Sequence, residues 1–383
     1  MKKRIFALFL ILVFALSCFT ACGDKDDDNS DKKKKAKSYD DVYEMIEDMG
    51  TFEKGTVTMS MDADLGEKGT AKMTAKIVSD GKNNYAIGIT LDVDSVKEQF
   101  NIDIDDFMIV KDAMAYINLG GLVKALTSVE PQVGEMLSGV KLGYFAIPLP
   151  DEFNQKKSTE VMKETVELCT KFLKRGFKDA TVKGEKDEFT ITFDNPDAYR
   201  TLLNELADFI EDDFQDYVDK NMDDFTSNDI DYNAYVKKLI DYYYDDIVVL
   251  ADAFGADKAT IDQAIAEIKK MDLNEQVGGY LNSELDMDDL YKELKDAAKE
   301  IRRAADNVSD EDFEKVESKI TLKSTDSGFT ARVSVDGVEV EGTEAKVTIE
   351  IKVSDSVGKI SKPGDITKLR DFKDLIAQFG GMF

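Results

Sequence analysis

Three cysteines, several aspartate groups and a tyrosine triplet are the residues whose types and spacing could do chemistry. Cys18 and Cys22 lie close together near the N-terminus, whereas Cys169 stands alone. The chain contains no histidine, so it lacks the usual base of serine and cysteine nucleophiles and the commonest metal ligand. No combination of nucleophile, base and metal ligands emerges. We therefore expect neither an enzyme nor a cofactor.

The residues before Cys22 have the order of a secretory leader. Three cations, Lys2, Lys3 and Arg4, precede an apolar run at residues 5–16, which is shorter than the ~20 residues of a membrane-spanning helix. The pair Ala21-Cys22 resembles a bacterial lipobox, which implies an N-terminal diacylglyceryl cysteine with palmitate-type chains at Cys22. Ser17-Cys18 also resembles a lipobox. We favour Cys22 because a charged stretch follows it directly.

Three regions follow from this pattern: a signal peptide at 1–21, a charged tether at 22–37 and an exported domain at 38–383. The tether has an acidic half, a basic half and almost nothing to bury. Without the three leader cations, 47 Lys and Arg residues face 78 Asp and Glu residues, a formal charge of −31. This charge disfavours nucleic acid as a partner. We expect an acidic lipoprotein held on the extracytoplasmic side of the cell membrane.

Apolar and polar residues alternate with a period of two in several segments, the pattern of strands with one buried face. The alternating apolar positions include Val57, Met59, Met61, Ala71, Met73, Ala75, Ile77, Ile87, Ile89, Leu91, Phe189, Ile191, Val333, Val335, Val347, Ile349 and Ile351. The predicted strands therefore fall in two regions, about 51–147 with 181–195, and about 318–383, which should also hold a short helix. The simplest arrangement joins both regions in one curved antiparallel sheet, and the alternative is two separate domains.

A long acidic helical insert, at about 196–317, separates the two strand regions. Asn195-Pro196 is a typical start of a helix, because Asn caps the free N–H groups and Pro suits the first helical position. Further helices are expected at about 154–174, 231–254, 259–271 and 287–305, and Ser309 should begin a last one. The predicted class is α+β, with the curved antiparallel sheet packed on helices.

This layout resembles the lipoprotein-carrier family, in which a curved antiparallel sheet wraps helices around an apolar cavity. The resembling segments are 51–119 and 319–353, with the apolar strand at 113–119, about a third of the chain. The resemblance implies a lipid-anchored carrier of an apolar ligand. The long acidic helical insert departs from the family, and no family residue can be assigned to a position here.

Each group that could form a site has a structural alternative. Tyr242-Tyr243-Tyr244 could stack on sugars, but one core tyrosine and two at its rim is the favoured interpretation. Asp103, Asp105 and Asp106 could bind calcium or act as a glycosidase pair, but a strand edge or solvated loop is favoured. The side chains that could line an adaptable apolar pocket, although an ordinary core is favoured, are Met59, Met61, Met73, Met108 and Met114. Cys169 lies in a helical apolar pattern and should be a buried thiol.

Three functions remain open from these observations. The first is a lipid-anchored protein that binds or carries an apolar ligand, and the second is a structural or interaction lipoprotein of the cell envelope. The third, a solute-binding lipoprotein of a transporter, fits less well, because such proteins usually alternate strands and helices around parallel sheets. The ligand-binding residues and the partner protein are not determined by the sequence.

The anchor gives the first testable prediction. Replacing Cys22→Ala should release the protein from membranes or leave it as an unprocessed precursor, because the acylated thiol is lost, and two acyl chains are needed for stable anchoring. Replacing Cys18→Ala should leave acylation intact. Metabolic labelling with an acyl-chain probe measures both, and label that persists on the Cys22 variant would move the site to Cys18.

Overall fold

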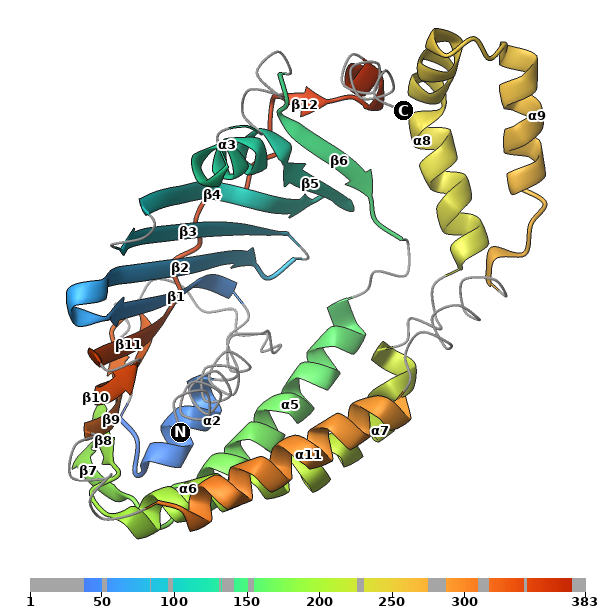
Figure 1. Ribbon diagram of the computed structural model, residues 1–383. Coiled ribbons are helices and arrows are strands. Elements are labelled where there is room, and N and C mark those ends of the chain that lie inside the picture. The colour runs from blue at the N-terminus through green and yellow to red at the C-terminus, as the bar shows by residue number, and fades with distance from the viewer. Residues whose placement is uncertain are drawn as a thin grey trace.

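A computed structural model gives the structure of the chain. It describes residues 38–49, 54–82, 84–95, 99–130, 132, 141–150, 155–225, 231–274, 287–308, 317–340 and 343–373. The leader, the tether with Cys22, the alternative Cys18 and the helix expected from Ser309 lie outside the described residues. The described part of the chain contains both helices and one curved sheet, so the predicted α+β class is confirmed (Figure 1).

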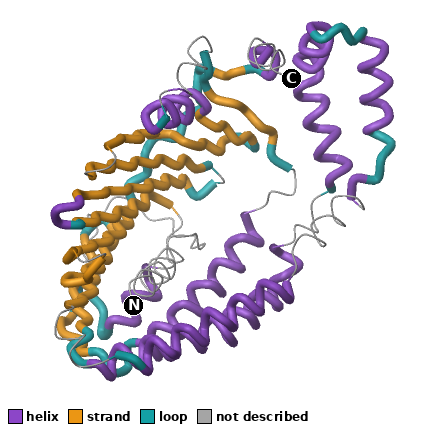
Figure 2. The backbone as a smooth tube through the Cα atoms, in the orientation of Figure 1, coloured by secondary structure: helices purple, strands orange, loops and turns teal. Residues whose placement is uncertain are grey.

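The strands of the described residues form one 12-stranded sheet, in the order β12-β6-β5-β4-β3-β2-β1-β11-β10-β9-β8-β7. The strands are β1 (Lys54–Asp64), β2 (Gly69–Asp80), β3 (Tyr85–Ser95), β4 (Gln99–Lys111), β5 (Met114–Asn118), β6 (Tyr144–Pro148), β7 (Thr181–Glu185), β8 (Glu188–Thr192), β9 (Glu317–Thr325), β10 (Gly328–Val340), β11 (Thr343–Ser354) and β12 (Ile366–Thr367). A short 3₁₀ turn, η1 (Gly66–Lys68), joins β1 to β2. Figure 2 shows the strands as a single curved wall with helices on its inner side.

The two strand regions meet where β1 pairs with β11. The antiparallel register runs from Thr56 opposite Ser354 to Asp64 opposite Lys346. The apolar residues of β1 and those of β11 lie on the same face of the sheet, because residues directly opposite each other in a ladder project to the same face. The predicted single sheet made from N-terminal and C-terminal strands is therefore what the structure has.

One pair of strands differs from the predicted antiparallel sheet. After β11 the chain crosses the outer face, where Thr56 Oγ1 donates a hydrogen bond to Ser356 O (2.8 Å) and Lys111 Nζ donates one to Ile360 O (3.1 Å). It then forms β12, which pairs in parallel with β6. A long crossover of this kind permits a parallel pair, whereas tight hairpins permit only antiparallel ones. Figure 1 shows the crossover passing behind the strands.

Most helices lie on the inner side of the curve. The α-helices of the described residues are α2 (Val42–Met49), α3 (Leu119–Val129), α5 (Gln155–Gly176), α6 (Pro196–Asp208), α7 (Phe214–Phe225), α8 (Tyr232–Ala253), α9 (Lys258–Ile268) and α11 (Met287–Asp306). The expected cap is present, since Asn195 Oδ1 accepts a hydrogen bond from Ala198 N at 2.8 Å. The helix expected from there on is interrupted by the π-helical turn η2 (Phe209–Asp213), which separates α6 from α7.

The main core lies between one half of the sheet and α2, α5 and α6. Met45 and Leu173 are fully buried there, together with Ile191 of β8 and Ile349 and Ile351 of β11. Phe172 packs on Phe209, with ring centroids 5.1 Å apart. These apolar contacts fix the helices to strands β8–β11 and β1.

Two arginines neutralise part of the acid in the helical layer. Arg175 of α5 pairs with Asp213 and, at 2.8 Å, with Glu205, while Lys171 Nζ lies 3.2 Å from Asp213. Arg302 of α11 pairs with Asp208 at 2.7 Å and with Glu211. Because η2 inserts an extra residue into its turn, it brings acids of α6 and η2 within reach of neighbouring helices.

Helix α8 contacts the opposite end of the sheet. Tyr243 stacks on Phe145 of β6, with centroids 5.7 Å apart and planes 6° apart. The buried Asp246 accepts a hydrogen bond from Leu369 N at 3.0 Å and pairs with Arg370, in and beside the 3₁₀ turn η3 (Leu369–Phe372). Ile240 and Asp246 are both buried in this contact, and the burial of an acidic side chain was not predicted.

The core gives the second prediction. Replacing Ile351→Ala should lower the free energy of unfolding by about 2–5 kcal/mol, because it leaves a cavity beneath the helices. Ile77→Ala, on the same face but 36% exposed, should cost clearly less. Urea unfolding of both variants measures the two losses. Equal losses would contradict the conclusion that helices cover Ile351 on β11 but not Ile77 on β2.

The third prediction concerns pH. Burial raises the pKa of Asp213, but hydrogen bonds from Arg175 and Lys171 outweigh it and hold the pKa below its usual value. The carboxylate therefore stabilises the fold above its unfolded pKa, and this contribution is lost as the pH falls through the lower folded pKa. Asp213→Asn should cost about 1–3 kcal/mol at pH 7, and the difference from the unchanged chain should shrink below pH 4.

Asp216→Asn, a change in the exposed part of α7, is the matched control and should stay within about 0.5 kcal/mol. Urea unfolding at neutral and acid pH compares the three chains. A loss for Asp213→Asn that is the same at both pH values would show that the ion pair does not carry the effect.

Candidate functional site

Apolar side chains form continuous rows across the inner face of the sheet. In one row, Ile349 of β11 faces Met61 of β1, which faces Met73 of β2. The row continues through Leu91 of β3 to Ile102 of β4. Facing residues of an antiparallel pair lie on the same side. The row therefore crosses five strands without a polar side chain.

The helical cover of these rows ends at β1. On β11 Ile349 is 1% exposed and Val353 is 3% exposed, whereas on β2 Met73 is 41% and Ile77 36% exposed. We call the eight apolar residues at 71–77 and 87–93 on the inner face of β2 and β3 the open strip, and none of them is buried. They are Ala71, Met73, Ala75, Ile77, Ile87, Ile89, Leu91 and Val93.

Helix α3 covers the sheet on the far side of the open strip. A side chain at Gly121 would lie 2.7 Å from Ile104 Cγ2, so the absence of a Cβ allows α3 to approach β4 closely. Gly121 N also donates to Asn118 Oδ1 at 2.7 Å, which caps the helix. Ile104 is buried as a result. The open strip thus lies between strands covered by α2 and α5 and a strand covered by α3.

One end of the open strip carries two hydroxyl groups. Ser79 of β2 faces Tyr85 of β3, one row beyond the pair Ile77 and Ile87. Burial raises the pKa of Tyr85, so its hydroxyl is neutral at pH 7. The strip itself contains no charged residue. It can therefore contact an apolar molecule along its length and offer hydroxyl groups at one end.

The structure divides the five methionines of the predicted pocket. Met59, Met61, Met73 and Met108 belong to the inner face by their register. Met114 instead packs with Ile109 and Tyr116 in a separate cluster beneath the outer crossover. The alternative of one pocket lined by all five therefore does not hold for Met114, because β5 directs its even-numbered side chains to the outer face.

The tyrosines at 242–244 have separate structural roles, which fits the interpretation of one tyrosine in the core and two at its rim. Tyr243 packs on Phe145, and its hydroxyl donates a hydrogen bond to Ala146 O. Tyr242 is exposed, while Tyr244 donates to Asp262 Oδ1 of α9 at 2.5 Å. The three rings therefore do not form a common stacking surface.

The acidic candidates lie on β4, as exposed residues. Asp105 and Asp106 belong to a bulge opposite Gly88, where the register with β3 shifts. A Cβ at Gly88 would lie 2.2 Å from Asp105 O, so glycine is needed for this close approach. Within the described residues no group of three acidic or cysteine side chains could hold a metal ion.

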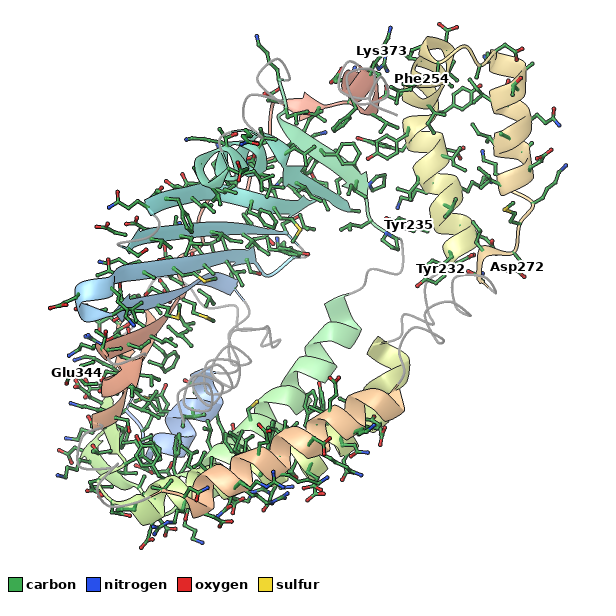
Figure 3. All side chains as sticks on the ribbon, in the orientation of Figure 1. Tyr232, Tyr235, Phe254, Asp272, Glu344 and Lys373 are labelled. Atoms are coloured by element: carbon green, nitrogen blue, oxygen red, sulfur yellow. The ribbon has the colours of Figure 1, made fainter. Side chains whose placement is uncertain are left out.

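Two further features lie apart from the open strip. Cys169 is buried in α5, in the main core, as its helical pattern predicts. A cavity of about 310 Å³ lies between α8 and α9, lined by residues that include Asn233, Lys237 and Ile268. Figure 3 shows Tyr232, at the start of α8, close to Asp272, which follows α9. Its lining is mixed in polarity, with charged side chains at the surface.

Sequence alternation identified the open strip residues as sheet-facing but did not identify them as a site. The strands that form it, at residues 69–80 and 85–95, have the same pattern as the fully covered β11. A period-two pattern reports which face a side chain takes, not what covers that face. The methionines among the alternating residues are the one signal for a site, because methionine adapts its shape to different partners.

No helix among the described residues has the length and apolar content to cross a membrane.

Comparisons with other proteins add no identification. The chain matches no protein-family model, no curated protein and no solved structure with which it was compared.

Proposed function

We propose that this protein is an exported lipoprotein, held at the cell membrane by a diacylglyceryl group on Cys22, that binds an apolar ligand on the open strip. The observation that carries the proposal is the contrast along one face of one sheet. Ile349 is 1% exposed under the helices, while Met73, two strands away in the same row, is 41% exposed.

The size of the open strip supports a binding role. Alternate residues on a strand lie about 6.7 Å apart and strands about 4.8 Å apart. The four rows of the strip are therefore about 20 Å long, and its two strands are together about 10 Å wide. The product, about 200 Å², approaches the size of the largest apolar patches on soluble proteins, which are often functional.

The composition of the open strip supports an apolar ligand with a long shape. Its eight residues are alanine, methionine and branched aliphatic side chains, which gain about 25 cal/mol per Å² when a ligand removes them from water. Methionine adapts its shape to different partners. The hydroxyl groups of Ser79 and Tyr85 lie at one end, where a polar end of an acyl-chain compound would find hydrogen-bond partners.

The two other classes have less support. The sheet pairs its strands in antiparallel fashion apart from β12 with β6, which is unlike the parallel sheets of most transporter solute-binding proteins. A structural or interaction lipoprotein of the envelope would use the same face for a protein partner. Failure to bind any small apolar molecule would favour that alternative.

The test measures binding of the neutral fluorescent hydrocarbon diphenylhexatriene to the processed chain, residues 22–383, with Cys22→Ser so that no lipid or detergent is needed. The unchanged strip should bind the probe at a saturable site. Ile77→Glu should weaken binding at least tenfold, about 1.4 kcal/mol, because it places a carboxylate in the apolar contact. Ile77 is already 36% exposed, so the fold should tolerate the change.

Thr74→Glu is the matched control. It adds the same charge to the same strand, but on the outer face, because the even-numbered residues of β2 alternate with the odd-numbered residues of the strip. It should change probe affinity less than twofold. The proposal fails if the chain does not bind the probe, or if both glutamates weaken binding equally while circular dichroism shows both variants folded.

A further inference from the structure

The methionines of the described residues occupy three different environments. Met45 of α2 is fully buried, with 0% of its surface exposed. Met73 is 41% exposed in the open strip, and Met271, after α9, is 48% exposed and far from the strip in the sequence. Oxidation of a thioether depends on its access to the oxidant. Met73 and Met271 should therefore react with a peroxide well before Met45.

The neighbours of Met73 make its oxidation consequential. Met61 faces it on β1 and Leu91 faces it on β3, and Ala71 and Ala75 lie on either side along β2. A sulfoxide carries a strongly polar oxygen, which needs a hydrogen-bond donor or water. None of these four side chains can donate a hydrogen bond. A bound apolar ligand would remove water from that oxygen without replacing it.

We propose that Met73 is an oxidation site through which a peroxide switches off ligand binding on the open strip. The inference rests on the proposed function. In the reaction, the thioether sulfur attacks one peroxide oxygen, an S–O bond forms and the O–O bond breaks. The other oxygen leaves as hydroxide and takes the proton of the sulfur-bound oxygen, giving water. The sulfur loses two electrons, and the peroxide gains them.

The experiment treats the processed chain, with Cys22→Ser, with hydrogen peroxide, removes the peroxide with catalase and titrates diphenylhexatriene. Peptide mass spectrometry reports the sulfoxide at each methionine. Met73 and Met271 should carry oxygen while Met45 does not, and probe affinity should fall at least tenfold. The probe affinity of Met73→Leu, whatever its value before treatment, should change less than twofold on the same treatment, because leucine has no sulfur to oxidise.

Met271→Leu is the matched control, since it removes an equally exposed methionine outside the strip. It should lose affinity after peroxide as the unchanged chain does. If the probe binds and Met73 is oxidised but affinity does not change, the inference is overturned and the proposed function stands. Loss of affinity in oxidised Met73→Leu would also overturn it, since another methionine would then be responsible. If the untreated chain does not bind the probe, the proposed function itself has failed.

Discussion

The pairing of β1 with β11 is the interaction on which the structure depends. These strands come from opposite ends of the chain, and their ladder extends from Thr56 and Ser354 to Asp64 and Lys346. Without it the sheet would end in two free edges, each with unpaired backbone groups and half of the apolar face. With it, the rows on β2–β4 become continuous with those on β8–β11. The outer crossover at residues 355–365 reinforces the joint by tying β11 to β12 at the far end.

The helical insert then determines which half of this face meets water. Helices α2, α5 and α6 bury the inner residues of β8–β11, because Phe172, Leu173 and Leu206 fill the space above them. Helices α3 and α8 reach only β4 and β6. The strands between them keep the same apolar residues without the same cover. Contact between such an apolar surface and water is unfavourable. An apolar ligand that displaces this water would therefore bind favourably.

Electrostatics acts on the helical layer rather than on the open strip. Arg175 and Arg302 each contact two carboxylates across helix boundaries, and the extra residue of η2 makes this geometry accessible. The open strip contains no charge of its own. The acids on the strands of and beside the strip, such as Asp92 of β3 and Asp103 of β4, lie on the outer face by their register, where water solvates them and where they are away from the residues that would contact an apolar molecule.

The sequence by itself determined the α+β class, the inward and outward faces of most strands and the helix start at Asn195. These features depend on local rules: side chains alternate along a strand, and an Asn side chain caps the nearest free N–H groups. The burial of Cys169 and the separate roles of the three tyrosines at 242–244 also followed from helical spacing.

Only the tertiary structure decided the rest. The parallel pairing of β12, the position of Met114 on the outer face and the burial of Asp246 beside Arg370 all depend on segments distant in sequence. The open strip is the clearest case, since Met73 and Ile349 have the same alternating surroundings but very different exposure. Alternation fixes the direction of a side chain within its strand, whereas its cover depends on where a helix more than a hundred residues away comes to lie.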